Sequence, residues 1–401
     1  MNKIFEVLEN KAFDKISKAL FTLDSGKGIT LPVLQNVLIA QNSDFVTLTR
    51  SNMDRSLSFK IKKGTVCDFT GEKAFTVQSK ELAERTAGLE GFELLQDGEK
   101  LFLRSESTTA LQSPALFSEI MLPAEDFPIR PKVESPELFA SVDAESFFEA
   151  LKQGSVFASS EDTRAVLNGV FLEQVENELH FVATDGRRMF LKRIKTSRGT
   201  KGAFIIRKEE IETLCKVAKL CKVRGNIGIF KNSTGYCVAF SVGETVAIFS
   251  GKILEGVYPN YKQVIPRELE NIVSINRDVL EKAVKAIKQF TPKPERGDLG
   301  ISFRQHGRVF CAENFQGEVI TELAPSEKEL PAIDFQLVFF EEAIKNSKGA
   351  FKLAFSDAFS PALLKTETEF FILMPLRKPE TNRRPAEPER QIENEPETVN
   401  A

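Results

Sequence analysis

The chain has 401 residues, of which 42% are hydrophobic and 28% charged, and its formal net charge is −3. This length exceeds one ordinary core and predicts two to four domains of roughly 150 residues each. No apolar run approaches the ~20 residues of a membrane helix. Lys3 and Glu6 place charges where a signal peptide is apolar, so we expect a soluble, cytoplasmic protein.

The near-neutral net charge argues against indiscriminate affinity for DNA, but it allows a local positive surface, which is what a nearby phosphate experiences. The five cysteines include no Cys-x-x-Cys pair, and His180 and His306 lie far apart. Disulfide and zinc sites both require spacings that the chain lacks. We therefore expect reduced thiols, no metal site and no cofactor.

Three amphipathic helices of similar pattern are predicted along the chain, each with apolar residues at helical spacing. Their apolar positions are Phe13, Ile16 and Leu20; Phe147, Phe148 and Leu151; and Leu280, Ala283, Val284 and Ile287. A short strand that leads into a second helix also recurs, starting at Phe75, Phe204 and Phe335. These starts lie roughly 130 positions apart, which is domain size and well beyond the period of solenoid repeats. The pattern predicts three domains with two helix-plus-sheet halves each, although chance similarity of amphipathic helices remains the alternative on spacing alone.

Proline-containing segments separate the predicted domains. The run from Phe127 to Pro136 ends the first domain, and the run from Ile265 to Glu268 ends the second. The expected domains are residues 1–132, 133–267 and 268–377. Residues 378–401 are rich in proline and glutamate with almost nothing apolar, which predicts a disordered tail.

The stretch from Glu161 to Met189 predicts two successive strands. Residues 166–172 are rich in branched and aromatic side chains, and the strand pattern resumes from Leu179 to Thr184 after a polar turn. Asp185-Gly186 then ends the strand, and Arg187-Arg188-Met189 follows. A hydrophobic surface that ends at a cationic edge is more typical of peptide binding than of catalysis.

The sequence contains none of several common motifs of catalysis and phosphate binding. Gly26-Lys27 and Gly251-Lys252 lack the following Ser/Thr and the earlier glycine of a phosphate-binding loop. The chain has neither a Gly-x-Ser-x-Gly elbow nor a His-Glu-x-x-His helix. Asp185 is explained by its place in a turn. We therefore expect a protein that is not an enzyme.

A family resemblance rests on four stretches in family order. Arg164-x-x-Leu-Asn-Gly-Val170 followed by Val182-Ala-Thr-Asp-Gly-Arg-Arg-Met189 resembles the central domain of the bacterial DNA polymerase III beta subunit, the sliding clamp. The stretches Thr30–Leu34, Tyr258–Pro266 and Phe371–Arg377 fit the same family. The ordered set covers the chain from its start to Arg377.

The resemblance implies an α+β DNA clamp with three repeated domains per chain, in which helices line a ring and sheets form its outside. Two chains are expected to form a head-to-tail homodimer around double-stranded DNA, without sequence specificity. The implied function is that of a non-catalytic processivity factor, which tethers replicative and repair polymerases through a peptide-binding pocket between domains 2 and 3. The other expected partner is an ATP-driven clamp loader, and no membrane is involved.

The resemblance also implies site residues. The family's partner-peptide pocket falls on Leu167, Thr184, Gly186, Arg187, Arg188, Met189, Pro259, Val264, Phe359, Pro361, Ile372, Leu373, Met374, Pro375, Leu376 and Arg377. Met189, Pro259 and Met374 are expected as apolar walls, with Arg188 and Arg377 at the rim. The family's DNA contacts fall on Lys27, Lys80 and Arg164, whereas Ala165 and Val166 replace aromatic residues that touch single-stranded DNA in a relative.

Basic residues also lie off the apolar stripe of the predicted helices. They are Lys11, Lys15, Lys18, Lys80, Arg85, Lys152, Lys208, Lys216, Lys219, Lys282, Lys285, Lys288, Lys345 and Lys348. Such residues usually mark solvated helix faces, so their DNA-facing role depends on the family resemblance. Two alternatives stay open: a DNA-free scaffold paralogue with the same fold, and an enzyme of unrecognised type.

Overall fold

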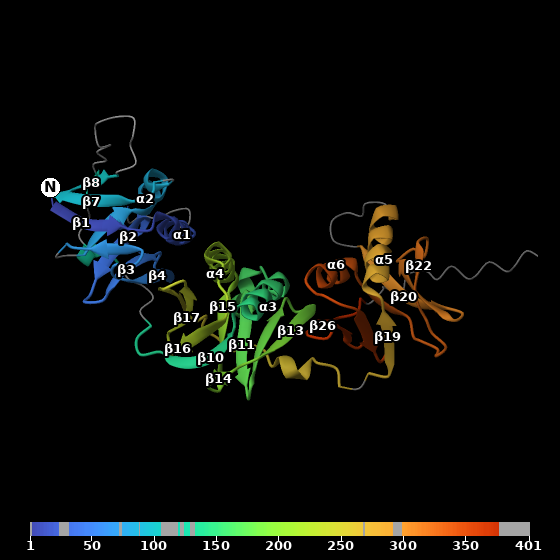
Figure 1. Ribbon diagram of the computed structural model, residues 1–401. Coiled ribbons are helices and arrows are strands. Elements are labelled where there is room, and N and C mark those ends of the chain that lie inside the picture. The colour runs from blue at the N-terminus through green and yellow to red at the C-terminus, as the bar shows by residue number, and fades with distance from the viewer. Residues whose placement is uncertain are drawn as a thin grey trace, which may run out of the picture.

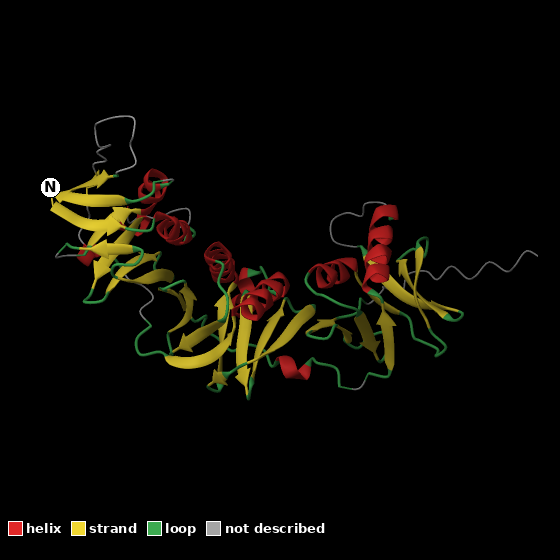
Figure 2. Ribbon diagram, viewed as in Figure 1, coloured by secondary structure: helices red, strands yellow, loops and turns green. Residues whose placement is uncertain are grey.

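The computed structural model describes residues 2–23, 32–71, 74–87, 89–105, 119–120, 124–128, 133–267, 269–291 and 299–376. These residues form a crescent of three similar units, with helices along the concave side and sheets along the convex side (Figures 1 and 2). The α+β fold class that the sequence predicted is therefore confirmed. We propose the domain boundaries at 132/133 and 267/268. The predicted tail lies outside the described residues.

Each unit contributes two helices to the concave side. They are α1 (Asn10–Phe21) and α2 (Ser79–Thr86), α3 (Ala144–Phe157) and α4 (Lys208–Cys221), and α5 (Arg277–Phe290) and α6 (Leu337–Lys345). The predicted apolar stripes are buried, since Phe13, Phe147 and Leu280 are fully enclosed. Short polar side chains begin two of these helices: Asp143 accepts the Ser146 N–H at 2.9 Å, and Asn276 accepts the Asp278 N–H at 2.8 Å.

Four sheets of antiparallel strands form the convex side. The first has the order β5 (Cys67–Phe69), β1 (Asn2–Val7), β7 (Phe92–Asp97), β8 (Lys100–Arg104) and β9 (Glu119–Ile120). The second has the order β14 (Arg198–Gly199), β10 (Glu137–Asp143), β16 (Asn226–Lys231), β17 (Gly235–Val242), β18 (Thr245–Lys252), β4 (Arg55–Lys62), β3 (Phe45–Ser51), β2 (Asn36–Gln41) and β6 (Phe75–Gln78).

The third sheet has the order β15 (Gly202–Arg207), β11 (Gly169–Val175), β12 (Glu178–Thr184), β13 (Arg188–Lys195), β26 (Glu369–Leu373), β25 (Ala362–Lys365), β24 (Phe351–Phe355) and β19 (Asn271–Ile275). The fourth has the order β22 (Ile320–Pro325), β21 (Val309–Asn314), β20 (Gly300–His306) and β23 (Ile333–Gln336). Four 3-10 turns complete the described structure: η1 (Pro32–Gln35), η2 (Ala124–Asp126), η3 (Asp162–Leu167) and η4 (Tyr261–Gln263).

Neighbouring units share a sheet. At the first joint β4 of the first unit pairs with β18 of the second, so that Phe59 faces Ala247. At the second joint β13 of the second unit pairs with β26 of the third, so that Lys192 faces Glu369. Backbone hydrogen bonds therefore run across both joints.

Apolar packing also crosses the second joint. The ring of Phe157, at the end of α3, lies 5.6 Å from Phe190 of its own unit and 5.4 Å from Phe371 of the next. Among the six helices of the described chain, none has the length and apolar composition that a bilayer crossing requires. No group of three His, Cys, Asp or Glu side chains in the same residues is placed to hold a metal ion.

Candidate partner-peptide pocket and helix face

A cavity of about 240 Å³ lies at the second joint. Four segments meet there: the η3 turn, the turn between β12 and β13, the connection through η4, and the end of β26. Its lining residues are Arg164, Leu167, Thr184, Gly186, Arg187, Arg188, Met189, Tyr258, Pro259, Asn260, Tyr261, Val264, Ile372 and Met374. A site assembled from segments that are distant in sequence depends on the pairing of β13 with β26.

Ten of the sixteen residues predicted for the peptide pocket line this cavity. They are Leu167, Thr184, Gly186, Arg187, Arg188, Met189, Pro259, Val264, Ile372 and Met374. The structure thus brings the central stretch and the terminal strand together around one concavity, and their role in binding is our proposal below.

The other six predicted pocket residues lie elsewhere. Leu373 is fully buried on the opposite face of β26, because successive side chains of a strand point to opposite sides. Phe359 is 69% exposed but outside the lining, as are Pro361, Pro375 and Leu376. The Leu376 N–H donates to the Asp334 carbonyl at 2.8 Å, which fixes the end of this segment. Arg377 lies outside the described residues.

Four lining residues were not predicted for the pocket: Arg164, Tyr258, Asn260 and Tyr261. Tyr258 and Tyr261 belong to Tyr258–Pro266, one of the stretches on which the family resemblance rests. The sequence therefore gave a reason to include them that the prediction did not use. The Tyr258 ring stacks on Phe171 at 4.5 Å. Arg164, predicted as a DNA contact, is exposed in η3, and a Cβ on Gly186 would lie 2.9 Å from its Nη1. Gly186 has a φ of 90°, so glycine suits both the conformation and the space.

The pocket has apolar walls and an apolar mouth. Leu167, Met189 and Ile372 are at most 5% exposed and belong to a small buried cluster beneath the cavity. Val264 and Met374 are 46% and 41% exposed at the mouth. Concave sites with apolar walls and exposed apolar rims bind apolar side chains of a partner, because contact removes both surfaces from water.

Arg188 holds the second joint together with its guanidinium group. Its Nε donates to Asp185 at 2.9 Å, and its Nη1 pairs with Glu342 on α6. The group lies between two rings, 4.9 Å from Phe157 and 5.2 Å from Phe339. The expectation that Arg188 would stand at the rim is therefore corrected: the residue lines the cavity, but its charge is committed to α6.

A buried polar cluster around Lys192 also stabilises the second joint. Lys192 Nζ lies 3.0 Å from Glu149, 2.9 Å from Gln153 and 2.9 Å from Glu369. Although burial by itself raises the pKa of Glu369, hydrogen bonds from Thr366 and Lys192 lower that pKa below its ordinary value. Removal of one partner would leave a buried charge without compensation, so the cluster fixes the arrangement of α3 against β26.

The segment between β18 and β19, which contains η4 and forms one wall of the pocket, is anchored by hydrogen bonds to the neighbouring sheet. The Tyr261 hydroxyl donates to Glu173 at 2.6 Å, and Lys262 pairs with the same carboxylate at 3.0 Å. His180 Nδ1 lies 2.9 Å from the Tyr261 oxygen. Since the hydroxyl proton goes to Glu173, Nδ1 of His180 is the donor in that contact. Burial lowers the pKa of His180, which favours the neutral ring.

The helices of the concave side carry most of the predicted basic residues at exposed positions. Exposed lysines on or just after its helices are Lys11, Lys15, Lys18, Lys80, Lys152, Lys216, Lys219, Lys282, Lys285, Lys288, Lys345 and Lys348. Lys80, the second residue of α2, has a side chain that is 63% exposed and lies 3.9 Å from Glu84. Lys27, the other predicted DNA contact, lies outside the described residues.

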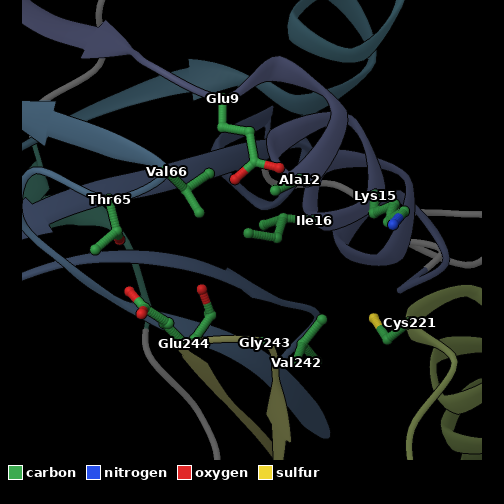
Figure 3. Close-up of a pocket in the computed structure, with 11 residues that line it drawn as sticks. Glu9, Ala12, Lys15, Ile16, Thr65, Val66, Cys221, Val242, Gly243 and Glu244 are labelled. Atoms are coloured by element: carbon green, nitrogen blue, oxygen red, sulfur yellow. The ribbon is translucent and has the colours of Figure 1, made fainter.

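A second cavity of about 510 Å³ lies at the first joint, between α1, the end of α4 and the β17–β18 turn (Figure 3). Glu9 and Glu244 extend from different walls, while Lys15 belongs to α1 and Cys221 is the last residue of α4. Burial raises the pKa of the Cys221 thiol to about 11, so the thiol is protonated at neutral pH. This cavity gathers no set of groups that converge on one ligand.

Comparisons with known proteins agree over most of the chain. A family model described as DNA polymerase III beta subunit, central domain, matches residues 141–260. The beta sliding clamp of Chlamydia pneumoniae is 26% identical over 368 residues, which cover 86% of this chain and 92% of the relative. That of Rickettsia felis is 25% identical over 367 residues, covering 86% and 93%.

Solved structures share the fold. The DNA polymerase sliding clamp of Bacillus subtilis matches with a TM-score of 0.79 and 19% identity, covering 94% of this chain and 100% of that one. A Pseudomonas aeruginosa sliding clamp bound to griselimycin matches with a TM-score of 0.76 and 22% identity over the same shares. Together with the sequence stretches and the three-unit crescent, these matches show that the chain is similar in sequence and fold to the bacterial DNA polymerase III beta subunits, the DNA sliding clamps.

Proposed function

We propose that this chain forms a ring around duplex DNA and tethers polymerases to it. In this role it is a non-catalytic processivity factor. The observation that carries the ring proposal is the crescent itself, whose concave side is made of helices with exposed lysines (Figure 2). Such a surface attracts phosphates by charge without entering the grooves, so it holds DNA without reading its sequence. The proposed role implies a cytoplasmic location.

The two ends of the crescent support a head-to-tail dimer. In the first two units the fourth strand pairs with the last strand of the next unit, as β4 does with β18 and β13 with β26. The corresponding strands at the two ends of the chain are β22 and β9, which are edge strands among the described residues. Pairing β22 of one chain with β9 of a second repeats the internal joint, and two chains of three units then close a ring.

Exposed apolar groups at one end support the same dimer. Leu23, Phe157 and Phe290 each lie 14 residues after the N-cap of the first helix in their unit. Leu23 and Phe157 are fully buried, and Phe157 packs against Phe371 of the next unit, whereas Phe290 is 66% exposed. Ile320, at the start of β22, is 55% exposed. We infer that a second chain covers Phe290 and Ile320, since large exposed apolar patches mark interaction sites.

The pocket at the second joint is proposed as the docking site for short peptide segments of polymerases and of an ATP-driven clamp loader. Its apolar walls suit central anchor side chains, and the exposed Arg187 beside it suits the peptide's polar or acidic flank. The DNA-free scaffold is not favoured, because the relatives that match most of the chain are named sliding clamps, and the helices of the concave side have exposed lysines.

The ring proposal is tested by comparing how long the protein stays on circular DNA and on the same DNA after it is cut. Protein loaded onto a nicked circular plasmid should remain bound through gel filtration and leave rapidly once a restriction enzyme linearises the plasmid. The same protein should bind short linear duplexes weakly, with an affinity that falls as salt rises. A protein that stayed equally long on cut and uncut plasmid would have to hold DNA by direct affinity, and the ring proposal would then fail.

A further inference from the structure

One wall of the pocket is a segment that pairs with no strand. This wall segment, which we define as residues 254–267, lies between β18 and β19 and belongs to none of the four sheets. Among the described residues its backbone hydrogen bonds run only within the segment, from the Gln263 N–H to the Asn260 carbonyl at 3.2 Å and from the Val264 N–H to the Tyr261 carbonyl at 3.3 Å. The backbone therefore does not fix where this wall stands against the rest of the pocket.

Two tyrosine rings place the wall segment on the neighbouring sheet. The Tyr258 ring stacks on Phe171 of β11, with the centroids 4.5 Å apart and an angle of 6° between the planes. The Tyr261 ring meets the same Phe171 edge-on at 6.2 Å. Apolar contact of this kind is favourable but not directional, so it holds the segment to the sheet without fixing its exact position.

The Tyr261 hydroxyl supplies the directional contact. It donates a hydrogen bond to Glu173 at 2.6 Å and accepts one from His180 Nδ1 at 2.9 Å. Glu173 and His180 lie directly opposite each other on β11 and β12, so two neighbouring strands hold one hydroxyl group. Lys262, the next residue of the segment, donates to the same carboxylate at 3.0 Å.

The protonation states of these groups strengthen the contact. Although burial by itself raises the pKa of Glu173, hydrogen bonds from Tyr261 and Lys262 lower that pKa below its ordinary value. Burial and the hydrogen bond to Glu173 raise the pKa of Tyr261. At neutral pH a protonated hydroxyl therefore donates to an ionised carboxylate, which is the stronger class of hydrogen bond. Tyr261 is 5% exposed, so water has little access to replace this bond.

The groups that hold the wall segment lie outside the cavity. The segment lines the cavity with residues 258–261 and Val264. Phe171, Glu173 and His180 do not line it. A peptide in the pocket would therefore touch the wall but none of the three side chains on the sheet that hold the wall in place.

We propose that Glu173 and His180 position this wall through the Tyr261 hydroxyl, and that they thereby set the affinity of the pocket for its peptide. The inference rests on the proposed docking of partner peptides at this pocket. Glu173 and His180 are positioning residues, because they act through Tyr261 and touch no ligand. A wall that is in place only part of the time lowers the apparent affinity by the fraction of pockets that are competent to bind.

The test is Tyr261→Phe, which keeps the ring that lines the cavity and removes both hydrogen bonds of the hydroxyl. Binding of a fluorescently labelled polymerase-derived peptide to the full chain should weaken roughly tenfold, mainly through slower association. Hydrogen exchange followed by mass spectrometry should become faster in residues 254–267 and stay unchanged in β11 and β12.

A second tyrosine provides the matched control. Tyr236, on β17, donates to Glu210 at 2.9 Å and is fully buried in the same unit, but it does not line the pocket. Tyr236→Phe removes a hydroxyl–carboxylate hydrogen bond of the same kind. It should leave peptide affinity within about twofold even where it lowers the melting temperature. An equal loss of affinity in both variants would mean that general destabilisation, and not the wall, is responsible.

Two substitutions of Glu173 test the acceptor. Glu173→Ala removes it and should weaken peptide binding about as much as Tyr261→Phe. Glu173→Gln keeps an oxygen that can accept from the hydroxyl and should recover most of the lost affinity. The same loss in Glu173→Ala and Glu173→Gln would overturn the acceptor role.

Failure of the docking site and failure of the positioning inference give different results. A natural chain that binds no polymerase-derived peptide would refute the docking site and the inference with it. A natural chain that binds the peptide, alongside a Tyr261→Phe chain that binds it equally well, would refute only the positioning role.

Discussion

Met374 is the residue at which the pocket proposal is most easily tested. It is 41% exposed at the mouth, so truncation removes contact area from a partner without opening a cavity in the core. Met374→Ala should weaken binding of a polymerase-derived peptide by about 1–2 kcal/mol, or roughly tenfold, as measured by fluorescence anisotropy.

Phe359→Ala is the matched control for this prediction. Phe359 was predicted for the pocket on family resemblance, but at 69% exposure it lies outside the cavity lining. Its truncation should change peptide affinity by less than about threefold. The opposite ranking, with Phe359→Ala the more damaging variant, would move the binding site away from the cavity.

Residue types near the pocket could be predicted from the sequence, but side-chain directions could not. Met189 and Ile372 were recognised from their motifs, and both line the cavity. Leu373 was included with its neighbours, although strand alternation buries it on the other face. The role of Arg188 depends on Glu342 and Phe339, which come from a helix about 150 positions later. No local pattern specifies such a partner.

At the scale of elements, the start of α4 contains a buried carboxyl group that makes the stability of the fold sensitive to pH. Burial raises the pKa of Glu210 to about 7, and hydrogen bonds from Tyr236 at 2.9 Å and from the Arg207 N–H at 3.4 Å only partly offset that effect. In the unfolded chain the same carboxyl titrates near 4.5. Between these two pH values the folded protein holds a proton that the unfolded chain has lost.

Stability should therefore fall as pH rises from about 5 to about 7.5, by as much as about 3 kcal/mol from this group. Glu210→Gln keeps an oxygen that can accept both hydrogen bonds and removes the charge. It should raise the melting temperature at pH 8 and have little effect at pH 5. The neighbouring Glu209 is exposed and supplies the control Glu209→Gln, with no change expected at either pH. Equal melting curves for Glu210→Gln and the natural chain at pH 8 would show that the group is not held in an unfavourable charged state.

The helices and the pairing of strands differ in how far the sequence predicted them. The helix stripes at Phe13, Phe147 and Leu280 were found from periodicity, because a helix is defined by contacts between near neighbours. The pairing of β13 with β26 joins residues about 180 positions apart, and nothing in either strand alone names the other. The shared sheets at the joints, on which the pocket depends, were therefore found only in the folded chain.

At the scale of the whole molecule, the sequence led to a three-unit clamp through family resemblance, and the crescent confirms that architecture. What the resemblance left open was where one chain meets the next. The three units can be compared to locate this surface. A position that is buried in two units and exposed in the third indicates that a neighbouring chain covers it in the third. Phe290 is such a position, with Leu23 and Phe157 as its buried equivalents.

Phe290→Ala should accordingly separate the dimer without harming the fold. Because the side chain is 66% exposed in the single chain, its removal leaves no internal cavity, and the melting temperature of the monomer should be unchanged. In the dimer the same side chain would be a buried aromatic anchor, so its loss should cost about 2 kcal/mol or more and raise the dimer dissociation constant at least roughly thirtyfold. Sedimentation velocity across a dilution series measures this directly. Retention on nicked circular DNA should fall in parallel, since an opened ring releases its DNA.

Val257→Ala is the matched control for Phe290→Ala. Val257 is 91% exposed but lies in the connection between the second and third units, away from either end of the crescent. Its truncation should leave the mass of the dimer unchanged. If the Phe290→Ala chain sediments as a dimer at the same concentrations as the natural chain, the ring is closed by a different surface.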